Sequence, residues 1–239
     1  MSILQKPELL DLIANQSINK RVLQIGIAHG HSALELLKKG VCLTGGDISW
    51  NYISGLREKA VGGNFTQLDI LNLPFADNSF DMIVCLEVLE HIKDYDRAIK
   101  QMSRILTPGG VLFISVPTLR TERIFEFFFP KWLDICQHVN VFRMQDLVEV
   151  LSFHGIETEK TYKSNFHASF FWIFHSILHT RHDGTGKIDG NFWMSRMIET
   201  FWRILLKLRL AKVFDNLGTI FFPKSRIYLG RKSILRDFT

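Results

Sequence analysis

Between residues 21 and 117 the chain alternates short apolar segments with amphipathic ones, and this rhythm restricts the fold more than any other feature. Five apolar segments have the length and β-branched content of buried strands, at 21–25, 41–47, 65–69, 80–86 and 111–116. Between them, apolar residues at helical spacing predict helices at 32–39, 51–60 and 95–106. Strands and helices that alternate at this pitch form right-handed βαβ units, and therefore a parallel sheet with helices on both faces.

The rhythm changes after Pro117. Outside the alternating part, periodicity predicts helices at 7–17 and 143–154 and strands at 157–163 and 225–232. We therefore expect an α/β fold with a doubly wound, mostly parallel seven-stranded sheet of Rossmann-like type and a helical insertion before the last strand. In this division, one domain comprises 1–163 and 223–232, the insertion is 164–222, and the tail is 233–239.

The first predicted strand runs into a turn of small residues, Gly26, Ala28 and Gly30, and a helix follows. Such a turn lets a ligand approach the backbone, and the helix N-terminus adds amide donors. The GxGxG spacing differs from the GxGxxG of dinucleotide sites, because position 31 is His31. This spacing disfavours a nicotinamide-dependent oxidoreductase, although the turn by itself is equally compatible with close packing.

Acidic residues end the next two predicted strands, Asp47 the second and Asp69 the third. Open α/β sheets bind ligands at the carboxyl ends of their strands, and an acid on the second strand can accept the hydroxyls of a ribose. Asp47 could instead cap the helix that starts near Asn51. The turn and both acids are expected to face one crevice.

Several segments, in order, resemble the motifs of class I S-adenosylmethionine-dependent methyltransferases of the ubiquinone-biosynthesis type. They are RVLQIGIAHG at 21–30, LTGGDIS at 43–49, FTQLDILNLPFADNSFDMIVCLEVLEHI at 65–92, RILTPGGVLFISVP at 104–117 and HVNVFRMQDLVEVLSFHGIETE at 138–159. The resemblance is nearly continuous over 20–163 and resumes at 225–232. It implies methyl transfer from S-adenosylmethionine to an O, N or C acceptor on a small molecule, and the aromatic, basic residues 166–214 add a lipid-like acceptor as an alternative.

The resemblance also assigns cofactor roles to particular residues. The corresponding positions are Gln24, Gly26, Ala28, Gly30, Asp47, Ile48, Asp69, Ile70, Leu86 and Glu87. The glycine turn would meet the methionine part, Asp47 would hold the ribose hydroxyls and Asp69 the adenine amino group. Ile48 and Ile70 would lie beside the adenine, with Leu86 and Glu87 at the methionine end.

Two positions depart from the family pattern. Gln24 stands where the family has an acid, and Ala28 where it has a second glycine. An amide cannot offset the positive charge of the cofactor, and a methyl group crowds the backbone approach. The alternative to an enzyme is therefore a membrane-associated, non-catalytic scaffold with a degenerate methyltransferase fold.

Two histidines are placed to act as the base that an oxygen or nitrogen acceptor can need. His91 follows the fourth predicted strand and His138 lies past the fifth. His91 could instead order its loop, and His138 could make a structural hydrogen bond. No His, Cys or Asp cluster has metal-ligand spacing along the chain, so the sequence predicts no metal.

The C-terminal third is basic and aromatic: residues 160–239 contain 14 Lys and Arg against 5 Asp and Glu. Within 166–214, residues 192–214 predict a basic amphipathic helix with Trp at its rim, typical of a segment in a membrane interface. A lid over a hydrophobic pocket, a dimer interface, ordinary core and a solvated basic face remain alternatives. Charges interspersed with bulky apolar groups disfavour nucleic acid as a partner.

Cysteine usage and the N-terminus bear on localisation. Cys42 and Cys85 lie in apolar runs and are expected to be buried thiols, and there is no CxxC motif. The first residues lack the basic start and apolar stretch of a signal peptide. The sequence thus predicts a cytoplasmic protein with a peripheral membrane contact through 166–214.

Overall fold

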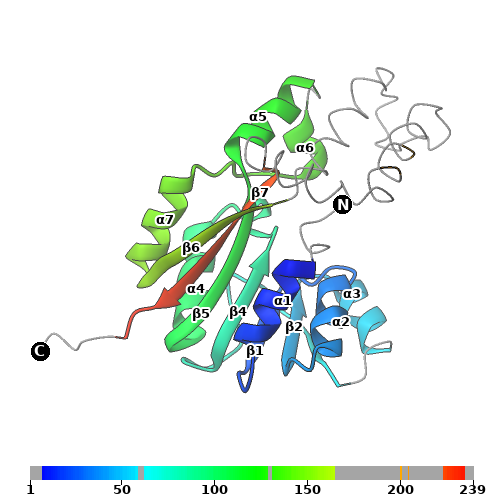
Figure 1. The fold of residues 1–239 in the computed structure, drawn as a ribbon, viewed down its shortest axis with the longest axis vertical. Coiled ribbons are helices and arrows are strands. Elements are labelled where there is room, and N and C mark those ends of the chain that lie inside the picture. Colours follow the sequence, from blue (N-terminus) through cyan, green and yellow to red (C-terminus); the bar gives the residue numbers. More distant parts are fainter. Residues whose placement is uncertain are drawn as a thin grey trace, which may run out of the picture.

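A computed structural model of the chain describes residues 7–58, 62–128, 131–164, 200, 204 and 223–234. These residues form a seven-stranded sheet of order β3-β2-β1-β4-β5-β7-β6 (Figure 1). The strands are β1 (Val22–Ile25), β2 (Leu43–Asp47), β3 (Asn64–Gln67), β4 (Phe80–Leu86), β5 (Leu106–Pro117), β6 (Ile156–Ser164) and β7 (Ser225–Lys232). Strands β1 to β5 pair in parallel, whereas β7 runs antiparallel between β5 and β6. The predicted doubly wound, mostly parallel sheet is confirmed.

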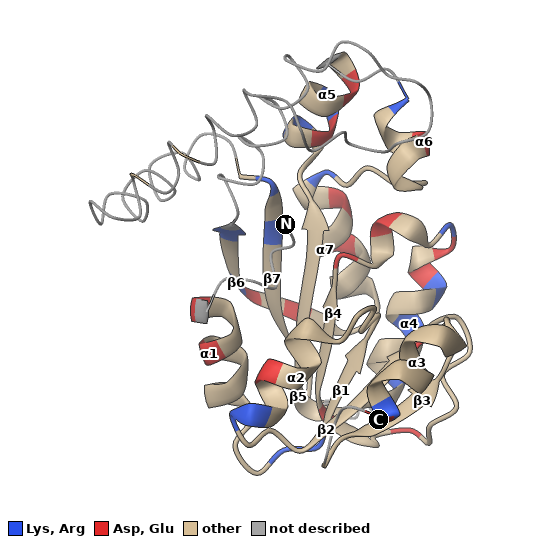
Figure 2. Cartoon of the chain, turned by 90° about the vertical axis from the view of Figure 1, so that its right-hand side faces the viewer, with Lys and Arg blue, Asp and Glu red and all other residues tan. Residues whose placement is uncertain are grey.

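Helices cover both faces of the sheet, as the side-chain alternation of β4 requires. Met82, Val84 and Leu86 belong to the core that includes α1 (Pro7–Gln16), α2 (His31–Lys38) and α3 (Trp50–Arg57). Ile83 and Cys85 point to the opposite core, which includes α4 (Tyr95–Ile105) and α7 (Met144–Phe153). Because successive strand residues face opposite sides, a strand buried on both faces has a nearly continuous apolar sequence. Charged residues accordingly lie mainly on the outer helices and loops (Figure 2).

Strand β5 begins earlier than the apolar run at 111–116 predicted. It starts at Leu106, which pairs with Phe80, and the pairing then shifts so that Val111 lies opposite Met82. Pro108 and Gly109 lie between Leu106 and Val111. Gly109 has a φ of +74°, a conformation that glycine adopts without strain. Strand β5 thus follows α4 without a connecting loop, and a bulge at residues 107–110 separates its first pair from the rest of the strand.

Three short elements were not predicted by periodicity: the 3₁₀ turn η2 (Leu89–His91) and the helices α5 (Leu119–Phe128) and α6 (Trp132–Cys136). Both helices lie beyond the end of the sheet at which the parallel strands finish (Figure 1). The expectation for Cys42 was wrong: it is exposed, because β2 begins only at Leu43, whereas Cys85 in β4 is buried.

The division at 164–222 and the membrane-interface prediction for 166–214 fall almost wholly outside the described residues. What the structure adds is that Ser164, at the end of β6, pairs with Ser225, at the start of β7. The two ends of the intervening segment therefore lie together at one edge of the fold. Among the described residues, no helix is long and apolar enough to cross a membrane.

Candidate functional site

A cavity of about 270 Å³ opens at the carboxyl ends of β1, β2 and β4. Its lining residues are Ile25, Gly26, Ala28, Asp47, Ile48, Leu68, Asp69, Ile70, Glu87, Val88, His91 and Ile92. The glycine turn and both acids thus share one crevice, as the sequence predicted. Of the positions that the resemblance assigned to the cofactor, Gln24, Gly30 and Leu86 do not line it.

The turn after β1 approaches its neighbours closely. Gly26 has a φ of +74°, and a Cβ built there would lie 2.3 Å from Cγ2 of Val88. Ala28 also has a positive φ, +45°, which is unusual for a residue with a side chain. The Ala28 backbone N–H donates to Oδ2 of Asp47 over 2.9 Å, so the turn and the acid hold each other in place.

Asp47 is 8% exposed and accepts a second backbone hydrogen bond, at Oδ1, from the N–H of Ser49 over 2.9 Å. Ser49 precedes helix α3, so Asp47 also supports the start of that helix, which was the alternative interpretation. Each carboxylate oxygen has a further lone pair, so Asp47 can still accept hydroxyl groups from the crevice. Asp69 is held similarly, by the N–H of Leu71 over 2.9 Å.

Gln24, Gly30 and Leu86 support the turn from behind. The Gln24 side chain is buried, and its Nε2 donates to Oγ of Ser32 over 2.6 Å, which joins β1 to the start of α2. Gly30 has a φ of +78°, and a Cβ there would lie 2.2 Å from Cδ2 of Leu56. Leu86 belongs to the core beneath. Packing and hydrogen bonding within the fold are therefore sufficient to explain these three residues.

Glu87 is fixed by strands distant in sequence. Its Oε1 accepts the Ser115 hydroxyl over 2.8 Å, and its Oε2 accepts the Ser225 hydroxyl over 3.1 Å. Lys224 Nζ lies 3.7 Å from the same Oε2. Since Ser225 begins β7, the antiparallel strand contributes directly to one wall of the crevice.

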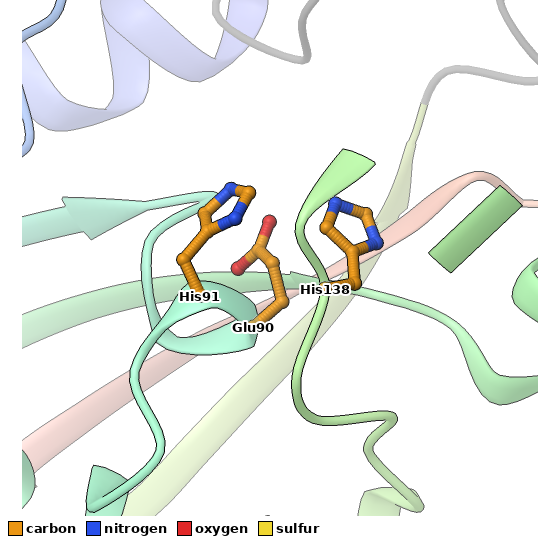
Figure 3. Close-up of side chains that lie close together, drawn as sticks. All are labelled: Glu90, His91 and His138. Carbon is orange, nitrogen blue, oxygen red and sulfur yellow. The ribbon is translucent and has the colours of Figure 1, made fainter. Parts of the chain in front are cut away.

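The two histidines predicted as bases lie together, with ring centroids 5.0 Å apart (Figure 3). His91 lines the crevice, whereas His138 is not among its lining residues. The Nδ1 atom of His91 lies 3.0 Å from the Gln137 carbonyl oxygen, and that of His138 lies 3.0 Å from Oε2 of Glu122. These contacts confirm that both rings are held by hydrogen bonds, as the structural alternatives supposed, and they leave a base role at Nε2 open.

Comparisons with known proteins agree with this geometry. Residues 23–114 match the family model for a methyltransferase domain. This segment of the chain is therefore similar to known methyltransferase domains. The chain is 36% identical over 100 residues to the ubiquinone biosynthesis O-methyltransferase of Coxiella burnetii. The aligned region covers 40% of this chain and 43% of that protein. The chain is 33% identical over 106 residues to methyltransferase GfsG of Streptomyces halstedii, with 41% and 38% covered.

The chain spans about two fifths of the length of the curated relatives it matches. Solved structures extend the likeness of fold to nearly the whole chain. A putative sarcosine dimethylglycine methyltransferase from Galdieria sulphuraria has a TM-score of 0.62 at 16% identity, covering 95% of this chain and 85% of its own. The [4+2]-cyclase SpnF has a TM-score of 0.63 at 20% identity, with 95% and 82% covered. A cyclase with this fold shows that activity has to be argued from the site.

The residues that line the crevice fit S-adenosylmethionine. The Gly26 turn leaves no room for a side chain, Asp47 retains lone pairs for ribose hydroxyls, and Ile48, 70% exposed, offers an apolar surface beside Ile70. Gln24, which stands in place of the family acid, does not line the crevice. Ala28, by contrast, lines the crevice.

Glu90, the most deeply buried carboxyl beside the crevice, was not among the site residues predicted from the sequence. It is 1% exposed, and its Oε2 has no hydrogen-bond partner among the described residues. Burial, and next the negative charge of Glu87, raise the pKa of Glu90 well above its usual value. For His91, loss of surrounding water lowers the ring pKa, an effect that the Gln137 carbonyl opposes. Only the sequence LEVLEH, with acids beside a histidine, hinted at this group.

Proposed function

We propose that the chain transfers a methyl group from S-adenosylmethionine to an O, N or C acceptor on a small molecule. The observation that carries the proposal is the shared crevice, in which the glycine turn, Asp47 and Asp69 meet at the strand ends. The donor supplies an electrophilic methyl group. The contributions of the chain are position and electrostatics, which dominate the catalysis of such displacements.

The residues divide the work by location. Asp47 would hold the ribose, Asp69 the adenine amino group, and the turn at Gly26 would admit the methionine part. His91 lies on the same crevice and is proposed to take the proton of an oxygen or nitrogen acceptor through Nε2. Its lowered pKa favours the neutral ring that a base requires.

Isothermal titration calorimetry with S-adenosylmethionine tests the proposal. Submillimolar binding is expected, and Asp47→Ala should weaken it by about 100-fold or more, because two hydrogen bonds to a charged group contribute about 1.5–3 kcal/mol each. Asp11→Ala is the matched control, since this carboxylate is exposed and pairs only with Lys39 in the described structure. Circular dichroism checks that Asp47→Ala is folded, and Asp47→Asn, which keeps the side-chain shape, separates loss of charge from disturbance of the turn.

The same titration decides between the enzyme and the non-catalytic scaffold. Gln24 and Ala28 motivate the scaffold, because both depart from the family pattern at the cofactor turn. Folded protein that binds no S-adenosylmethionine at millimolar concentration would support the scaffold and contradict the enzyme.

We also propose that the acceptor is lipid-like and that the chain contacts a membrane surface. The basic, aromatic composition of residues 166–214 supports both parts of this proposal. Because Ser164 and Ser225 pair, removing that segment leaves a short connection between β6 and β7. The deletion variant should sediment less with anionic liposomes than the full chain. Equal sedimentation of both proteins would contradict the membrane contact.

A further inference from the structure

We propose that Glu90, His91 and His138 bind a divalent transition-metal ion beside the crevice. One ligand atom from each residue can be chosen so that all three lie within 4.8 Å of one another. Figure 3 shows the carboxyl of Glu90 between the two imidazole rings. Ion binding does not depend on the proposed methyl transfer, but an ion held by Nε2 of His91 and the proposed base role of that atom exclude each other, because both use the same lone pair.

The backbone brings the two ligand segments together before any ion binds. The Glu90 carbonyl oxygen accepts the N–H groups of Val139 and Asn140, over 2.8 and 3.1 Å. The Asn140 side chain also donates to the carbonyl of Ile92 over 2.6 Å. These hydrogen bonds join the segment that carries Glu90 and His91 to the segment that carries His138. The conformational entropy that the chain would lose on binding an ion is therefore small.

Hydrogen bonds on the far side of each ring fix the tautomers. The Gln137 carbonyl oxygen can only accept, so Nδ1 of His91 carries the proton. Oε2 of Glu122 accepts the Trp132 indole N–H over 3.1 Å and faces Nδ1 of His138, so it acts as an acceptor there as well. Both Nε2 atoms are left as lone-pair donors. A carboxylate behind a ligating histidine is the usual arrangement in metal sites.

Glu90 supplies the third ligand and the second line of evidence. Its carboxyl is 1% exposed and its Oε2 has no hydrogen-bond partner among the described residues. A buried oxygen of this kind costs stability unless a proton or a cation satisfies it. Because this carboxyl lies between the two imidazole rings, a cation bound to one nitrogen of each ring can satisfy it as well.

The donor set indicates the class of ion. Two imidazoles and one carboxylate suit Zn²⁺, Co²⁺, Fe²⁺ or Mn²⁺ and leave coordination positions open, whereas Mg²⁺ and Ca²⁺ prefer oxygen ligands alone. Metal–ligand distances of about 2.1 Å place tetrahedral ligands roughly 3.4 Å apart, so binding would draw the side chains slightly closer. Since His91 lines the crevice, an open position can reach a ligand there. If the proposed function holds, an acceptor hydroxyl bound at that position would lose its proton more readily.

The test uses the full chain, treated with EDTA and titrated with Co²⁺ in the absence of S-adenosylmethionine. Visible absorption bands of bound Co²⁺ should saturate at one ion per chain. His138→Ala and Glu90→Gln should each weaken binding by more than about 100-fold. Glu122→Gln changes no ligand atom but perturbs the support of His138 and the contact with Trp132, and should weaken binding by about 10–100-fold. Circular dichroism confirms that each variant is folded, and Glu90→Gln, nearly isosteric, is the variant least disposed to misfold.

His31→Ala is the matched control, because it removes an exposed imidazole outside the cluster and should leave the titration unchanged. Absence of Co²⁺ binding at millimolar concentration would overturn the proposal. So would binding that survives both His138→Ala and Glu90→Gln, or that is lost with His31→Ala, since the ion would then be held by surface groups. Because the titration contains no S-adenosylmethionine, a failure to bind Co²⁺ would not decide whether the protein transfers methyl groups.

Discussion

The turn at residue 28 offers a test of the site that depends on backbone physics alone. Ala28 has a φ of +45° and its N–H donates to Asp47 over 2.9 Å. The side chain is exposed, so no packing is lost when its methyl group is removed. Ala28→Gly therefore changes the conformational cost of the turn and little else in the folded state.

The magnitude follows from two opposing terms. A side chain in the left-handed region costs about 1–2 kcal/mol, which glycine avoids. Glycine also makes the unfolded chain more flexible, which costs about 0.4–1 kcal/mol on folding. The net expectation is that Ala28→Gly raises the free energy of unfolding by roughly 0.5–1 kcal/mol, which corresponds to about 1–4 °C in the melting temperature of a chain this long.

Urea unfolding followed by circular dichroism, with a thermal scan alongside, measures the effect. Ala98→Gly is the control, because Ala98 is fully buried within helix α4. There glycine should lower the free energy of unfolding by about 1 kcal/mol or more. The opposite signs are the diagnostic result. If Ala28→Gly destabilises the protein as Ala98→Gly does, the turn is not strained and the reasoning fails.

Three further predictions concern the same region. Gly30→Ala should destabilise the protein by roughly 1–3 kcal/mol more than Gly40→Ala, because both have φ near +80° but only Gly30 would place a Cβ against Leu56; equal losses in urea unfolding would contradict this. Glu90→Gln should stabilise the metal-free protein more at pH 8 than at pH 4. The pKa of Glu90 is raised in the folded state, so the folded protein keeps a proton that the unfolded chain loses above about pH 4.5, and the stability of the native protein falls as the pH rises. A difference in melting temperature between the two proteins that does not change with pH would refute this prediction. If His91 is the base, the rate of methyl transfer should rise with pH through a pKa below the ordinary 6.5, because the neutral ring is the active form. A pH–rate profile that rises through a pKa above 6.5, or one that is the same in His91→Gln, would exclude that role.

Much of the crevice was predictable because its parts lie at strand ends. The glycine turn, Asp47 and Asp69 each follow a segment recognisable as a buried strand, and parallel strands end at one edge of a sheet. Once the strand order is known, their meeting is a geometric consequence. The sequence pattern did not reveal the contacts of Gly30 and Gln24. Gly30 packs against Leu56, and Gln24 donates a hydrogen bond to Ser32.

The surroundings of the two histidines could not be predicted in the same way. Glu122 belongs to α5 and His138 follows α6, and periodicity predicted neither helix. The sequence prediction of no metal rested on spacing along the chain, which cannot detect ligands contributed by separate segments. The proposed ion site therefore depends on contacts that no local pattern encodes.

By itself the sequence determined the α/β class, the strand-forming segments and the turn that opens the crevice, because hydrophobic periodicity and glycine are local signals. Only the tertiary structure decided which distant residues complete the walls. Ser225 reaches Glu87 because β7 enters the sheet beside β5, and His138 reaches His91 because backbone hydrogen bonds join their segments at Glu90. Burial, hydrogen-bond partners and shifted pKa values are set by such long-range contacts, and they give the site its chemistry.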